Sequence, residues 1–128
     1  MSSVWKGPLE RIDEFRWRIP KGYKQGMRAD AIVVTDAEGL EVARDGEALE
    51  QLANSACLPG ISQPALAMPD IHSGYGFPIG GVGAMRLEDG VITPGGIGFD
   101  INCGVRLIRT NLELGDATPK IKPWIDRL

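Results

Sequence analysis

The hydrophobic and polar positions of this chain alternate in short runs, a pattern typical of strands with one buried face. Residues 15–19 alternate apolar and basic side chains, and Pro20 ends that run. The apolar run 65–69 predicts a strand that delivers Asp70 and His72. The strands predicted in this way are, in chain order, 15–19, 31–34, 65–69, 79–85, 97–101 and 105–108.

A helical spacing of apolar residues follows Asp45, for which we predict the role of N-cap. The apolar positions of this helix are Leu49, Leu52, Ala53, Ala56 and Cys57. Residues 58–60, Leu-Pro-Gly, end the helix, and turns are predicted at 36–39 and 87–90. Because Cys57 lies on the apolar side, we interpret it as a small buried hydrophobic residue.

The last residues predict an amphipathic helix that begins near Pro119 or Pro123. Its apolar face consists of Ile121, Trp124, Ile125 and Leu128. The chain stops while this pattern is still running and shows no capping signal. We therefore expect the sequence to be a fragment of a longer protein.

The composition is that of a soluble globular protein, and 128 residues are enough for one domain, 1–128. We find no apolar run of membrane-spanning length, no signal peptide and no disulfide framework, so the expected location is the cytoplasm. Residues 1–28 hold seven Lys and Arg against three acids, whereas 29–104 hold two against eleven. We call residues 1–28 the basic arm. The simpler interpretation of its charges is a solvated surface, and contact with phosphates is the alternative.

The segment 70–111 contains the only histidine and ten of the seventeen glycines. Such glycine density indicates tight turns or a close approach of the backbone to a ligand. Asp100 and Cys103 would point to opposite faces of an unbroken strand. A bend at residues 102–103 would bring the carboxylate and the thiolate together as half of a divalent metal site. Ordinary residues at a strand end are the alternative interpretation.

Asp70 and His72, two residues apart, share one face if their strand continues. A carboxylate beside an imidazole can fix its tautomer or raise its pKa, while a structural, hydrogen-bonded histidine is the alternative. The glycines 74, 76, 80 and 81 match neither a dinucleotide fingerprint nor a P-loop. Glycine-rich turns can still present backbone N–H groups to a phosphate.

Two long segments resemble a known family. Residues 68–82 read MPDIHSGYGFPIGGV and residues 95–105 read GGIGFDINCGV. Both resemble the N-terminal signature segments of the RtcB family of GTP-dependent RNA-splicing ligases, and the similarity extends over essentially the whole chain. The resemblance implies an N-terminal part of a larger α/β (α+β) fold, with mixed sheet segments and few helices.

The resemblance also implies a function. Members of the family join RNA ends that carry a 2′,3′-cyclic phosphate or 3′-phosphate to 5′-hydroxyl ends, using GTP and Mn²⁺. Asp100 and Cys103 match metal ligands, with the thiolate shared between two metal ions. Asp70 matches an acid beside the histidine that carries the guanylate. His72 belongs to the same pocket wall.

The family's remaining histidines, including the guanylate acceptor, lie beyond the part that this chain matches. We therefore expect the chain alone to be inactive. Two alternatives remain open: a shortened homologue that acts as a non-catalytic binding or regulatory module, and one half of a split ligase. The partners implied are RNA ends (tRNA halves or other cleaved RNA), an archease-type activator and a separate C-terminal ligase chain.

Overall fold

A computed structural model describes residues 4–98 and 108–127 of the chain. The elements are short strands and short helices. In chain order they are β1 (Glu10–Arg11), β2 (Arg16–Ile19), η1 (Lys21–Tyr23), β3 (Ala31–Val34), α1 (Ala37–Arg44), α2 (Ala48–Ser55), β4 (Ala65–His72), β5 (Ile79–Val82), α3 (Pro94–Ile97), α4 (Leu114–Ala117), η2 (Thr118–Lys120) and α5 (Ile121–Ile125).

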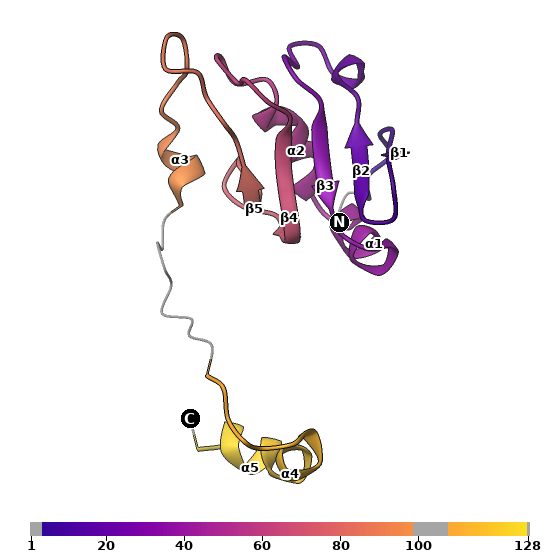
Figure 1. The fold of residues 1–128 in the computed structure, drawn as a ribbon, viewed down its shortest axis with the longest axis vertical. Helices are drawn as coiled ribbons and strands as arrows, with labels where there is room; N and C mark the ends of the chain where they lie inside the picture. Colours follow the sequence, from indigo (N-terminus) through magenta and orange to yellow (C-terminus); the bar gives the residue numbers. More distant parts are fainter. Residues whose placement is uncertain (1–3, 99–107, 128) are drawn as a thin grey trace.

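The five strands form one mixed sheet in the order β1-β2-β3-β4-β5 (Figure 1). Strands β3 and β4 are parallel, and all other neighbours are antiparallel. The parallel pair needs a crossover connection, and α1 and α2 supply it. The prediction of an α+β fold with a mixed sheet is confirmed. The strands predicted at 15–19, 31–34 and 65–69 are present as β2, β3 and β4, and β4 continues three residues further, to His72.

The core lies between one face of the sheet and the two crossover helices. Alternate residues of β3 and β4 have small side chains that are fully buried there, namely Ala31, Val33, Ala65 and Ala67. Leu49 and Leu52 of α2 pack in the same cluster. Cys57, predicted to be buried, packs against this cluster but is only partly buried. Small side chains on the sheet let the helix approach closely, so the larger leucines fill the space between the layers.

Helix α1 is absent from the sequence prediction, which placed a turn at its start. Asp36 begins this helix, and its carboxylate accepts a hydrogen bond of 2.8 Å from the backbone N–H of Gly39. The prediction that Asp45 is an N-cap is wrong, because Asp45 is the C-cap of α1 and Glu47 occupies the N-cap position of α2. Gly46, with φ of 99°, makes the sharp connection between the helices.

The segment after β4 departs from the predicted strands. Strand β5 ends at Val82, and Met85 forms only an isolated bridge with Ile61. A turn follows at 87–90, where the N–H of Gly90 donates to the carbonyl of Arg86. The predicted strand from Ile97 is wrong at its first residue, because Ile97 ends the single helical turn α3. Pro94 fixes the backbone at the first position of that turn.

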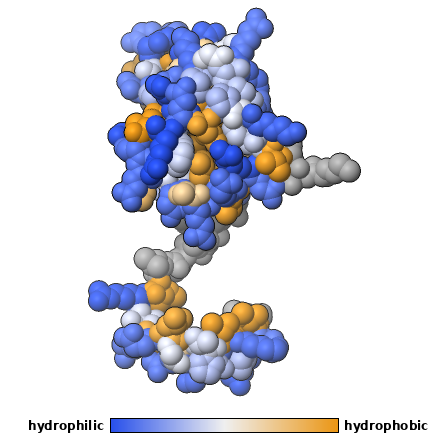
Figure 2. Space-filling view, turned by 90° about the vertical axis from the view of Figure 1, so that its right-hand side faces the viewer, coloured by the Kyte–Doolittle hydropathy of each residue, from blue (hydrophilic) through white to orange (hydrophobic). Residues whose placement is uncertain are grey.

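The amphipathic helix predicted at the end of the chain is present as α5, preceded by α4 and η2. Ile121 and Trp124 are each 44% exposed and Ile125 is 64% exposed. Figure 2 shows hydrophobic atoms gathered on one side of this segment. Leu128, predicted on the same face, lies outside the described residues. None of the described helices has the length and apolar character needed to cross a membrane.

Candidate functional site

The end of strand β4 carries Asp70 and His72 on one face, on either side of the buried Ile71. This confirms the prediction that the two side chains share a face. Here β4 has extra residues opposite β5, because Ala67 pairs with Gly81 whereas His72 pairs with Ile79. An advance of five residues along β4 therefore matches two along β5. This β-bulge changes the direction of the side chains at this end of the sheet.

The Asp70 carboxylate lies directly over the backbone of Gly80 in β5. A Cβ atom on Gly80 would be 2.6 Å from Oδ1 of Asp70, and the φ of Gly80 is 75°. The left-handed backbone favours glycine, and a Cβ atom here would also push the Asp70 carboxylate aside. The bulge and this glycine together bring the carboxylate close to the neighbouring strand.

His72 is oriented by the backbone and not by the neighbouring carboxylate. Its Nδ1 lies 2.8 Å from the carbonyl oxygen of Asp70. Since a carbonyl oxygen can only accept, Nδ1 carries the hydrogen and donates it. In the neutral ring the proton is therefore fixed on Nδ1, which leaves the lone pair on Nε2 for a proton, a hydrogen-bond donor or a metal ion.

The glycine-rich loop after His72 is held against the start of α2. The Gln51 side chain donates from Nε2 to the carbonyl of Gly74 (2.9 Å) and accepts at Oε1 from its N–H (2.8 Å). Ser73 Oγ accepts from the N–H of Glu47 at 3.1 Å, at the N-terminus of α2. Gln51 is only 6% exposed, so its amide has little access to water and is satisfied by the loop. Sequence analysis did not identify Gln51 as part of the site.

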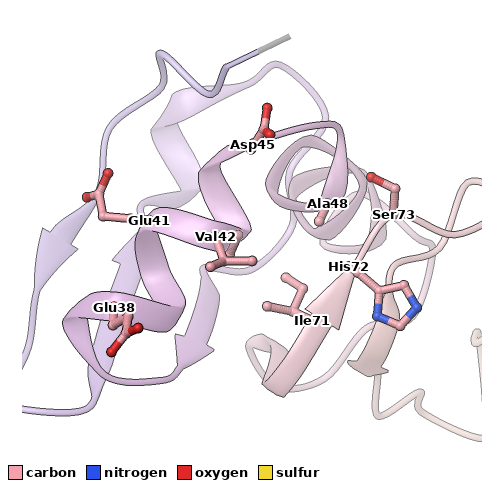
Figure 3. A pocket seen from close by; sticks show the side chains of 9 residues that line it. Glu38, Glu41, Val42, Asp45, Ala48, Ile71, His72 and Ser73 are labelled. Atoms are coloured by element: carbon pink, nitrogen blue, oxygen red, sulfur yellow. The ribbon is translucent and has the colours of Figure 1, made fainter. Parts of the chain in front are cut away.

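A hollow of about 660 Å³ lies between α1 and the end of β4. Figure 3 shows Val42 and Ile71 pointing toward each other across it, while the ring of His72 points away from Val42. Asp70 does not line this hollow. Its lining combines apolar side chains such as Val42 and Ile71 with polar ones, which are Glu38, Glu41, Asp45, His72 and Ser73.

Three of the seven basic residues in 1–28 form ion pairs with acids, namely Arg16, Arg18 and Lys24. Arg16 lies 2.7 Å from Asp13, and Arg18 contacts both Glu10 and Asp30. Such pairs favour the interpretation of this arm as a solvated surface over that of a phosphate-binding one.

Lys24 and Tyr23 donate hydrogen bonds to Glu50 of helix α2. Burial acts to raise the pKa of Glu50, but these two hydrogen bonds outweigh it and hold the pKa below its ordinary value. Burial, and then the bond to Glu50, raise the pKa of Tyr23.

The two predicted metal ligands, Asp100 and Cys103, lie outside the described residues, as does the predicted bend at 102–103. Within residues 4–98 and 108–127, no three side chains of His, Cys, Asp or Glu are grouped so that they could hold a metal ion. The site that the structure does describe therefore consists of Asp70, His72 and the glycine-rich loop held by Gln51.

Comparison with known proteins identifies the family. A family model described as tRNA-splicing ligase RtcB matches residues 51–128. The tRNA-splicing ligase RtcB of Archaeoglobus fulgidus is 49% identical over 96% of this chain, and that of Thermococcus kodakarensis is 54% identical over 94%. The Aeropyrum pernix relative is 51% identical over 94%. The chain belongs to the RtcB family, and it spans about a quarter of the length of these curated relatives.

Proposed function

We propose that this chain supplies one quarter of an RNA ligase that joins 2′,3′-cyclic-phosphate or 3′-phosphate ends to 5′-hydroxyl ends with GTP and Mn²⁺. The observation that carries the proposal is about 50% identity over nearly the whole chain to proteins named tRNA-splicing ligase. The signature segments 68–82 and 95–105 fall within that match. The proposed substrates are tRNA halves or other cleaved RNA in the cytoplasm, and an archease-type activator is a proposed partner.

Asp100 and Cys103 are the residues proposed to hold the metal. A carboxylate suits Mn²⁺, and an anionic thiolate between two cations offsets their mutual repulsion. Two donors are too few for a stable site, so the remaining ligands must come from the other part of the ligase. Manganese bound there would polarise phosphate oxygens and activate the attacking group.

Asp70 and His72 are proposed as part of the guanylate pocket. The bulge places the Asp70 carboxylate over β5, beside the backbone of Gly80. The hydrogen bond at Nδ1 of His72 leaves Nε2 able to accept a proton or hydrogen bond from a ligand or from a neighbouring imidazole. The exposed loop after His72 has backbone N–H groups of the kind that contact phosphates.

The proposal is tested with a hybrid protein in which this chain replaces the matched quarter of the Thermococcus relative. With Mn²⁺ and labelled GTP, the hybrid should form an acid-labile protein–GMP adduct, release pyrophosphate and join the RNA ends. Asp100→Ala and Cys103→Ala should abolish joining, whereas the matched controls Asp116→Ala and Cys57→Ala should retain it. Joining that survives loss of both proposed ligands would overturn the metal assignment.

The isolated chain provides the complementary measurement. We expect it to form no GMP adduct, because its only histidine is not in the motif of the guanylate acceptor and covalent catalysis needs that nucleophile. An adduct formed by the chain alone, and lost in His72→Ala, would show that the nucleophile is assigned to the wrong part of the protein.

A further inference from the structure

The two faces of the sheet differ in how they are covered. The residues facing α1 and α2 are fully buried, as described above. The next residues along each strand point to the opposite face, and the strand registers align Arg18, Ile32, Leu66 and Val82 in one row across four strands. We call Ile32, Leu66 and Val82 the open row.

The open row is apolar yet lies outside the core. None of its three residues belongs to the buried cluster. Val82 is 47% exposed, and Ile32 and Leu66 are half-buried. Figure 1 shows α2 behind strands β3 and β4, on the other side of the sheet. A row of three branched aliphatic side chains across neighbouring strands is typical of a face that packs against another layer.

The outer edge of β5 adds a second unpartnered feature. In the sheet order β5 is an edge strand, so one side of its backbone makes no strand pairing among the described residues. A groove of about 400 Å³ borders it, lined by apolar residues that include Phe77, Val82 and Ile97. An open strand edge beside an apolar groove accommodates an added strand, whose backbone would bond to β5 and whose side chains would enter the groove.

We propose that the open row and the β5 edge form the docking surface for the polypeptide that makes up the other three quarters of the RtcB relatives. The relatives are about four times the length that this chain covers, so a large polypeptide is available to cover this face. The open row carries no charge, and Arg18, which lies next to Ile32 in the register, is paired with Glu10 and Asp30. Such a surface fits a protein layer and does not fit RNA phosphates. This inference rests on the proposed function, since it takes the ligase as the partner.

Footprinting by carbene labelling of side chains tests the docking surface in the isolated chain and in the hybrid defined above, without GTP, metal or RNA. Labelling of Leu66 and Val82 should fall by about fivefold or more in the hybrid, as for side chains that become buried. Val42 is the matched control, because it is 70% exposed on α1, on the other side of the sheet. Its labelling should be similar in both proteins.

A pair of substitutions provides a second test. Val82→Asp should change the melting temperature of the isolated chain little, and should lower that of the hybrid by about 5 °C more, because a buried unpaired charge is costly. Val42→Asp should have equal effects in both. Equal labelling of Val82 in the isolated chain and in the hybrid would overturn the docking surface. Low labelling of Val82 in the isolated chain, caused by self-association or by contact with α4 and α5, would also overturn it. If labelling of the open row falls in the hybrid but the hybrid does not join RNA, the docking surface is supported and the proposed function is contradicted.

Discussion

The side chain of Gln51 provides a sharp test of how the site loop is held. Gln51→Ala removes both hydrogen bonds to Gly74, which are 2.9 and 2.8 Å long. Each such bond contributes about 1 kcal/mol net, so the free energy of unfolding should fall by about 2 kcal/mol. For a chain of this size, that loss corresponds to a melting temperature lower by about 5–10 °C.

Urea unfolding followed by circular dichroism measures the change in stability, and hydrogen exchange at the Gly74 amide reports the loop directly. Gln63→Ala is the matched control, because Gln63 is exposed and lies in a connection outside the site. It should change stability by less than about 0.5 kcal/mol. The reasoning is refuted if Gln51→Ala is no more destabilising than Gln63→Ala, or if exchange at Gly74 is unchanged.

Two further predictions concern Gly80 and Glu50. Gly80→Ala should destabilise the fold by about 1–2 kcal/mol, because of the left-handed backbone and the contact with Asp70. Gly22→Ala is the control, because a Cβ atom there would meet open space, and it should not destabilise the fold. Equal melting temperatures for the two variants would contradict this prediction. Because the pKa of Glu50 is held below its ordinary value of 4.5, its ionised form stabilises the fold above that pH, and this contribution is lost as the pH falls through the lowered pKa. Glu50→Gln should therefore cost under about 1 kcal/mol near neutral pH, after solvent screening, and the cost should vanish in acid. Denaturant unfolding at both pH values measures it, and a cost that is the same in acid would contradict the prediction.

The strands were predictable because their apolar spacing is local. Residues 31–34 and 16–19 alternate as half-buried strands do, and the structure places β3 and β2 there. Helix α1 was not predictable from apolar spacing, because only Leu40 and Ala43 of its eight residues are buried. Its start depends on the Asp36 side chain, which is equally typical of a turn.

Other features depend on residues distant in the sequence. Ser73 accepts from the N–H at the N-cap position of α2 from 26 residues away, so the local search for a capping residue selected Asp45. Gln51 looks like a polar residue on a helix surface until the loop that it binds, 23 residues later, is in place. For the site, the shared face of Asp70 and His72 followed from their spacing, but the bulge and the contact with Gly80 needed the neighbouring strand.

Co²⁺ substitution in the hybrid tests most directly whether Cys103 and Asp100 ligate a metal ion, as we propose. A thiolate bound to Co²⁺ gives a charge-transfer absorption band in the near ultraviolet that carboxylate and imidazole ligands do not give. We expect this band in the unaltered hybrid and in its Cys57→Ala variant, and we expect its loss in Cys103→Ala. A band that persists in Cys103→Ala, or that disappears in Cys57→Ala, would contradict the account.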